Sequence, residues 1–137
     1  MANIEPLTRV MCVDDDPGML QIAKICLQDM AGYSVELCSS GQEAVEKSAR
    51  FLPQLALVDM MMPDMDGVET VNRLRSVENL AQLPVILVTA VMGPAEANNC
   101  HEANAIAVIS KPFDPMSLAD RVRSEWLALQ ETLGHVT

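Results

Sequence analysis

Polar residues that could do chemistry stand at the ends of the short apolar runs in this sequence. "VDDDP" places three aspartates, residues 14–16, directly after one run, and "LALVDMMMPDMDG" places Asp59 directly after another. Thr89 follows "VILV", and Lys111 follows "IAVIS". Carboxylates hold hard cations, and positioned hydroxyl and ammonium groups stabilise a transferring phosphoryl group. The placement therefore indicates phosphoryl-transfer chemistry, provided that the fold brings these residues together.

Gathering the carboxylates has an electrostatic cost that suggests what else binds there. Two carboxylates ~4 Å apart repel by roughly 4 kcal/mol at an effective dielectric constant of about 20. Three of them would destabilise the fold or raise a pKa unless a cation joined them. A divalent ion and Lys111 would together neutralise three such charges. Oxygen ligands that leave some water in place suit Mg²⁺ better than zinc or copper, and an aspartate in this setting could attack phosphorus as a nucleophile.

The apolar runs alternate with helix-length segments. Five short runs rich in β-branched residues predict strands at 9–13, 34–38, 55–58, 84–88 and 106–109. "VILV" shows no polar alternation, so both of its faces must be covered, as in a parallel sheet between helices. We therefore expect an α/β protein with a doubly wound five-stranded parallel sheet in a single domain.

The segments between the strands predict five helices. The first covers residues 17–30, begins at the Asp16-Pro17 pair, and carries an apolar stripe of Leu20, Ala23, Leu27 and Met30. The second begins at Ser39 or Ser40, the third follows Gly67, and the last runs from about 115 to 129. The fourth segment, residues 92–105, has few large apolar residues, so we expect a loosely held helix there.

In such a sheet all strands point their carboxyl ends to the same edge, where ligands bind. If the first and third strands are neighbours, the 14–16 aspartates meet Asp59 at that edge. The fourth and fifth strands deliver Thr89 and Lys111 to the same place. This convergence is the central prediction from the sequence.

Composition excludes several other classes of protein. The chain has 137 residues and a formal net charge of -10, which makes nucleic acid an unfavourable direct partner. Its apolar runs are strand-sized, so no membrane insertion is expected. The four cysteines are widely spaced and form no zinc-like pattern, so we interpret them as buried thiols in a reducing, cytoplasmic setting.

The chain resembles the receiver domains of two-component response regulators over roughly residues 8 to 130. Four motifs carry the resemblance: "VDDDP", "VDMMMPDMDG", "VTA" and "SKPFDP". Their order and spacing are far more specific than any one of them. The resemblance implies the flavodoxin-like strand order 2-1-3-4-5. It also implies tails at 1–7 and 131–137 around a receiver domain at 8–130.

The resemblance implies a metal site and a phosphoacceptor. Asp59 is expected to accept the phosphoryl group. Asp14 and Asp15 are expected to hold Mg²⁺ together with Asp59 and with the backbone carbonyl of Met61.

Two further residues receive roles from the resemblance. Thr89 would hydrogen-bond the phosphoryl group and move toward it, and Lys111 would pair with a phosphoryl oxygen. The Lys111–Pro112 peptide bond is a candidate for the cis form. The protein would then be a phosphoacceptor signalling domain, catalysing only its own phosphorylation and slow dephosphorylation.

Two positions depart from the usual receiver pattern. Val108 stands three residues before the lysine, where receivers commonly carry an aromatic switch residue, and Asn104 replaces a common glycine. Rotation of an aromatic side chain cannot be the output signal at position 108. We therefore hypothesise that Thr89 pulls the following loop and tightens the fourth helix on phosphorylation.

Other functions are compatible with parts of the sequence. A small Mg²⁺-dependent phosphatase of the haloacid dehalogenase type would use Asp14 as nucleophile and Asp16 as acid. The "DMMMPDMDG" loop and the chain length favour the receiver. A pseudo-receiver, which is not phosphorylated, would not need the acceptor, the acidic pair, the threonine and the lysine, yet this sequence carries all of them.

The expected partners follow from the receiver reading. A sensor histidine kinase or a histidine phosphotransfer protein would supply the phosphoryl group. With no output domain after residue 130, we expect signalling through the protein's own fourth helix–fifth strand–fifth helix face.

Overall fold

The computed structural model describes residues 5–91 and 93–136, with side chains described up to residue 132. Five parallel strands form one sheet in the order β2-β1-β3-β4-β5. The strands are β1 (Arg9–Val13), β2 (Ser34–Cys38), β3 (Leu55–Asp59), β4 (Val85–Thr89) and β5 (Ala107–Ser110). The predicted α/β fold and strand order are confirmed.

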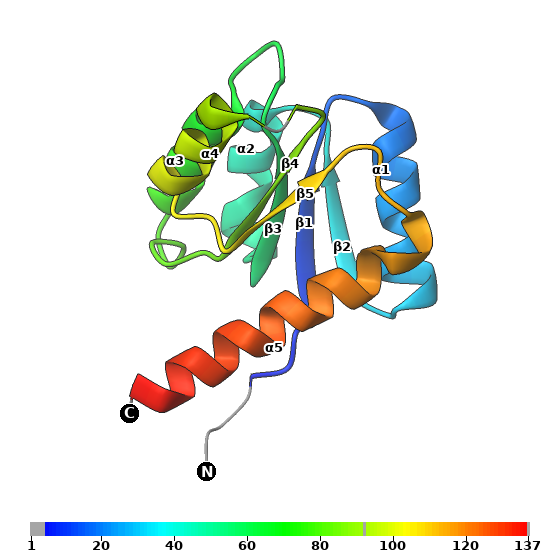
Figure 1. Cartoon of the computed structure of the whole chain (residues 1–137), viewed down its shortest axis with the longest axis vertical. Helices are drawn as coiled ribbons and strands as arrows, with labels where there is room; N and C mark the ends of the chain where they lie inside the picture. Colours follow the sequence, from blue (N-terminus) through cyan, green and yellow to red (C-terminus); the bar gives the residue numbers. More distant parts are fainter. Residues whose placement is uncertain (1–4, 92, 137) are drawn as a thin grey trace.

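Helices cover both faces of this sheet. Figure 1 shows α2 (Gly41–Phe51), α3 (Gly67–Arg75) and α4 (Pro94–Glu102) on one face. The other face carries α1 (Pro17–Ala23), its π-helical continuation η1 (Lys24–Met30), the short 3₁₀ helix η2 (Pro115–Ser117) and α5 (Leu118–Val136). All connections are therefore crossovers of the kind a parallel sheet requires.

The strands alternate their side chains between two hydrophobic layers. In β1, Met11 and Val13 face the layer under α2, α3 and α4, whereas Val10 and Cys12 face the layer under α1 and α5. All five residues of both β3 and β4 are buried, as the unbroken apolar runs predicted. The two covered faces fix the register, because a shift by one residue would exchange the layers.

The first helix differs from its prediction in its second half. The chain stays helical through Met30, but residues 24–30 form a π-helix. Met30 was predicted on the buried stripe and is instead 58% exposed, while Cys26 is buried beside Leu27. The wider π turns rotate later residues relative to an α-helical period, so the Met30 prediction was wrong.

The fourth helix is held mainly at its carboxyl end. No residue of α4 is buried, and its N-cap, Gly93, offers no side-chain hydrogen bond. Immediately after the helix, the carbonyl oxygens of Ala103 and Asn104 accept hydrogen bonds from the guanidinium of Arg75, which also donates to the Leu83 carbonyl before β4. These contacts agree with a loosely held helix; Met92, in the same predicted segment, lies outside the described residues.

The last helix is longer than the sequence indicated. Leu118, Val122 and Trp126 are buried against the sheet, and α5 continues to Val136, past the predicted end near residue 129. Residues 1–4 and 137 of the predicted tails lie outside the described residues. Across residues 5–91 and 93–136, none of the helices has the length and apolarity needed to span a bilayer.

Candidate functional site

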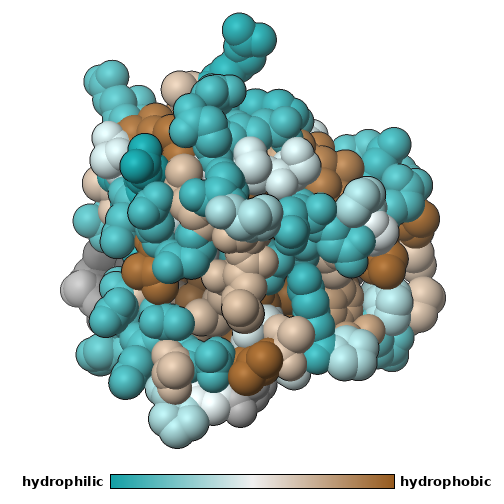
Figure 2. All heavy atoms as spheres, turned by 90° about the horizontal axis from the view of Figure 1, so that it is seen from above, coloured by the Kyte–Doolittle hydropathy of each residue, from teal (hydrophilic) through white to brown (hydrophobic). Residues whose placement is uncertain are grey.

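The carboxyl edge of the sheet gathers the polar residues singled out from the sequence. Asp14 and Asp15 directly follow β1, and Asp59 ends β3, whose neighbour on the other side is β4, ending in Thr89. Lys111 directly follows β5, and its amide N–H donates a 2.7 Å hydrogen bond to the Thr89 carbonyl. Figure 2, which looks onto this edge from above, shows a mostly hydrophilic surface with separate hydrophobic patches.

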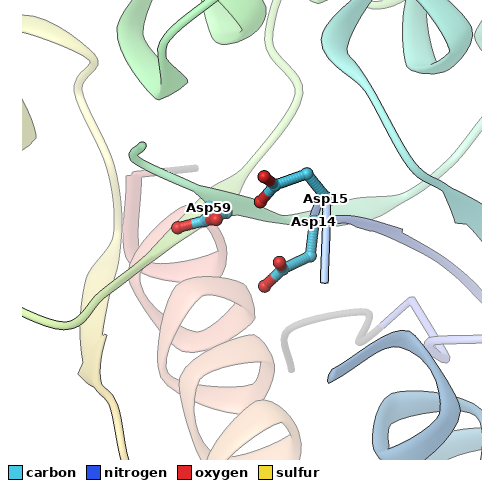
Figure 3. Close-up of side chains that lie close together, drawn as sticks. All are labelled: Asp14, Asp15 and Asp59. Atoms are coloured by element: carbon cyan, nitrogen blue, oxygen red, sulfur yellow. The ribbon is translucent and has the colours of Figure 1, made fainter. Parts of the chain in front are cut away.

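Three carboxylates form a cluster at this edge. Asp14, Asp15 and Asp59 each offer an oxygen, and these oxygens lie within 4.8 Å of one another. Figure 3 shows the three side chains close together, arising from β1 and β3. Asp14 and Asp59 are buried, whereas Asp15 is exposed. The cluster is therefore open to solvent on the Asp15 side.

Lys111 supplies the positive charge of the cluster. Its Nζ lies 2.7 Å from Asp14 Oδ2 and 3.6 Å from Asp59 Oδ2. Burial alone would lower the pKa of the lysine, but the Asp14 hydrogen bond and the charges of Asp14 and Asp59 give it a net increase. The Lys111–Pro112 peptide bond is cis, as the resemblance implied.

The remaining excess of negative charge contributes to a raised pKa of Asp59. Burial, followed by repulsion from Asp14, raises the pKa of this carboxyl to about 6, although Lys111 and the Met61 amide act in the opposite direction. One lysine does not neutralise three carboxylates. An aspartate with a raised pKa at a sheet edge is typical of a functional site.

The donor set fits a hard divalent cation. Clustered carboxylate oxygens with an opening to water are the ligands that Mg²⁺ prefers, and Cys or His ligands are not among the clustered groups. The Met61 amide lies 3.4 Å from Asp59 Oδ1, so this backbone is next to the cluster, while the Met61 side chain is 70% exposed. The role of the Met61 carbonyl as a ligand stays a prediction.

Thr89 has a partner that the sequence did not reveal. Its side chain is buried, and its hydroxyl donates a 2.9 Å hydrogen bond to the Val91 carbonyl. The Val91 amide in turn donates to the same hydroxyl at 3.2 Å. The hydroxyl is thereby engaged with the β4–α4 segment. A threonine before a loop gives no sequence signal for this contact.

Two neighbouring acids serve as helix caps. Asp16 accepts a hydrogen bond from the Gly18 amide and caps α1, as expected. Asp64 lies in the bend between β3 and α3, and its carboxylate accepts from the amides of Gly41 and Gln42 at the start of α2. Sequence spacing gave no signal for this long-range partner.

The positions that depart from the receiver pattern are also accounted for. Val108 lies in β5 and is half-buried. Asn104 adopts a positive φ of 50°, a conformation that asparagine tolerates better than most residues, which explains how it replaces glycine. All four cysteines are free thiols.

Comparison with known proteins gives a consistent result. The family model described as "Response regulator receiver domain" matches residues 10–123. Response regulator Rre1 of Synechocystis sp. is 32% identical over 120 residues, which cover 88% of this chain and 52% of Rre1. The signal transduction histidine-protein kinase BarA of Escherichia coli is 36% identical over 105 residues, covering 77% of this chain and 11% of BarA. The chain thus spans about half of Rre1 and a small part of BarA.

Solved structures show the same likeness. The crystal structure of a CheY-like response regulator receiver domain protein from Methanospirillum hungatei superimposes with a TM-score of 0.81 at 29% identity, covering 94% of this chain and all of the other. Receiver domains are signalling domains and not classical enzymes. With the fold, the sheet-edge cluster and the family match in agreement, the chain belongs to the response regulator receiver domain family.

Proposed function

We propose that this chain accepts a phosphoryl group on Asp59 from a histidine of a partner protein and, once phosphorylated, changes its binding to a downstream partner. The observation that carries the proposal is the convergence of Asp14, Asp15, Asp59 and Lys111 from the ends of three strands. No other arrangement in the described residues brings a nucleophilic carboxylate to an ammonium group and a cation-binding set.

The transfer forms one bond and breaks another. A carboxylate oxygen of Asp59 attacks the phosphorus as the phosphorus–nitrogen bond to the donor histidine breaks, and the electron pair of that bond returns to the imidazole. Lys111, 3.6 Å from Asp59, is placed to pair with a phosphoryl oxygen. The hydroxyl of Thr89 would exchange Val91 for the phosphoryl group. These residues orient the group and stabilise its charge.

Asp14, Asp15 and the Met61 carbonyl would hold Mg²⁺ beside Asp59. The ion would supply positive charge that offsets the carboxylates and the phosphoryl oxygens together. At neutral pH it would favour the ionised, nucleophilic form of Asp59, whose pKa is raised to about 6 without it.

Incubation with a small acyl phosphate and Mg²⁺ tests the proposal. We expect one hydroxylamine-labile phosphoryl group per chain, detected by intact-mass spectrometry, and none in Asp59→Asn. Asp66→Asn is a matched control, because Asp66 lies in the loop that follows Asp59 and caps α3, a role that asparagine also fills. The control should be labelled like the original protein.

The label's position separates the two candidate functions. Unchanged labelling of Asp59→Asn, with the group mapped to Asp14, would favour the phosphatase alternative and contradict the receiver proposal. If the original protein binds Mg²⁺ but takes up no label, the result would contradict both the receiver proposal and the phosphatase alternative.

Two surfaces suit the proposed partners. A hollow of about 400 Å³ beside Lys111 is lined by apolar residues including Met19, Ile22 and Phe113, and would receive the histidine-bearing phosphodonor. A second hollow of about 480 Å³ lies between β5 and α5 and includes Leu118 and Arg121. Its lining residues come from β5, α5 and the segment between them, and we propose that the downstream partner binds through this part of the α4–β5–α5 face.

A further inference from the structure

The loop between β3 and α3, residues 60–66, carries the backbone that would complete the metal site. Its ends are fixed: the Met60 amide donates to the Val88 carbonyl at 3.0 Å, and the Gly67 amide donates to the Met60 carbonyl at 2.9 Å. Met62 and Met65 are buried beneath the loop. Methionine is flexible and adapts its shape, so these side chains alone do not define one backbone position.

Asp64 ties the outer part of this loop to another helix. Its Oδ1 accepts from the Gly41 amide at 3.3 Å and its Oδ2 from the Gln42 amide at 3.0 Å. These are the first two amides of α2, which have no partner within their own helix. The next amide, of Glu43, is capped at 3.0 Å by Ser40. Two residues thus divide the cap of α2, one from its own segment and one from the β3–α3 loop.

The charge of Asp64 suits this position. A carboxylate at a helix N-terminus is stabilised by the helix dipole and by hydrogen bonds to its ionised form. Partial burial would raise the pKa of Asp64, but the hydrogen bonds from Gln42 and Gly41 lower it overall. Next to this contact, Met65 packs over Gly41 so closely that an added Cβ at Gly41 would clash with the Met65 side chain. The loop and the start of α2 are therefore in close contact.

We propose that Asp64 is a positioning residue for the phosphorylation site: by binding the start of α2, it fixes the 60–66 loop so that the Met61 carbonyl faces the acidic cluster. This inference rests on the proposed function, in which Met61 contributes to the Mg²⁺ site. Asp64 itself touches neither the clustered carboxylates nor Lys111.

Three variants of the full chain separate positioning from helix stability. Asp64→Ala removes both hydrogen bonds, Asp64→Asn keeps one acceptor oxygen without the charge, and Ser40→Ala removes a cap from the same helix without releasing the loop. Two quantities are measured: the Kd for Mg²⁺ by calorimetric titration, and the hydrogen-exchange rate of the Gly67 amide by NMR without metal. Urea unfolding gives the stability of each variant.

We expect Asp64→Ala to raise the Kd for Mg²⁺ about 3- to 10-fold. This is less than the roughly 10- to 100-fold caused by loss of a residue that hydrogen-bonds a metal ligand directly, because Asp64 acts only through the loop backbone. The Gly67 amide should exchange several-fold faster. Asp64→Asn should change the logarithm of the Kd and the logarithm of the Gly67 exchange rate by no more than half as much as Asp64→Ala does. Ser40→Ala should lose stability by a typical cap contribution while both quantities stay within twofold of the original protein.

Other outcomes would contradict either the role of Asp64 or the proposed function. Wild-type values of both quantities in Asp64→Ala, or equal losses in Asp64→Asn and Asp64→Ala, would overturn the positioning role; the second result would indicate a long-range charge effect. Failure of the original protein to bind Mg²⁺ would count against the proposed function instead, and the Gly67 exchange rate would still decide whether Asp64 fixes the loop.

Discussion

Two loops at the same sheet edge are built in opposite ways. The β3–α3 loop, residues 60–66, has three buried methionines, a hydrogen bond that closes it at Gly67, and the Asp64 contact to α2. The segment from β4 into α4, described at residues 90–91 and from 93 onward, leads into a helix with no buried residue. Its Val91 is 52% exposed and is held through the hydroxyl of Thr89.

The difference would suit the two tasks that the proposed function requires. A phosphoacceptor and its cation need fixed ligands, because small displacements weaken positioned chemistry. A segment that reports on phosphorylation needs two arrangements of similar free energy, and few buried contacts make that possible. The side chain of Arg75 contacts the residues just after the carboxyl end of α4, whereas the amino end has no side-chain cap.

Alanine substitutions at two glycines should expose the difference most strongly. A Cβ at Gly67 would lie 2.8 Å from Met60 Cα and 3.0 Å from the Asp59 carbonyl oxygen, both backbone atoms. We expect Gly67→Ala to lower the free energy of unfolding by about 3 kcal/mol, as overpacking against a fixed backbone does. Gly93→Ala meets only the end of the Glu96 side chain at 3.0 Å. Its effect in urea unfolding should be several times smaller, and equal losses would contradict the contrast.

At the end of β3, directly before this loop, burial and the neighbouring Asp14 make ionisation of Asp59 unfavourable. Because the folded-state pKa is about 6, above the usual 3.8, the protonated form stabilises the fold below about pH 4, and this stabilisation is lost as the pH rises through 6. An asparagine side chain at this position cannot ionise and so avoids this loss. Without Mg²⁺, the stability difference in favour of Asp59→Asn should therefore grow by about 2 kcal/mol as the pH rises from 4 to 7.5. Urea unfolding at several pH values measures the gain. If the stability difference between the two proteins does not change with pH, the charge of Asp59 does not destabilise the fold.

A smaller effect is expected from strengthening the loose region. Gly93 is the N-cap of α4, and its extended backbone, with φ of -155°, accepts any residue. Gly93→Ser would add a capping oxygen and restrict the unfolded chain, for a gain of about 0.5–1 kcal/mol. Hydrogen exchange across residues 94–102 should slow, and a phosphate mimic should slow it further if Thr89 draws the loop inward. Equal protection with and without the mimic would remove that switching hypothesis.

The sequence predicted the parts of this molecule that depend on local pattern. Short apolar runs predicted the strands, and polar residues after four of the five runs predicted that Asp14, Asp59, Thr89 and Lys111 lie at one edge. The strand order came from the resemblance. Met30 was misplaced because nothing in its segment signals a change from α to π geometry, which alters the helical period.

Contacts between distant segments were beyond sequence reasoning. The bond from Asp64 to α2 spans more than twenty positions, with |i−j| of 23 for Gly41 and 22 for Gln42, and depends on how the two helices lie side by side. The hydroxyl of Thr89 could have faced several acceptors, and the choice of Val91 follows from the course of one loop.

The ion pairs of Lys111 with Asp14 and Asp59 affect how the unphosphorylated protein would bind a phosphoryl group and how it responds to salt. The ammonium group acts as a built-in counterion, so an incoming phosphoryl group would exchange partners with an existing cation and would not have to recruit one from solution. Because the Lys111–Asp14 pair is mostly buried, its contribution should depend less on ionic strength than that of the exposed Glu69–Arg73 pair on α3.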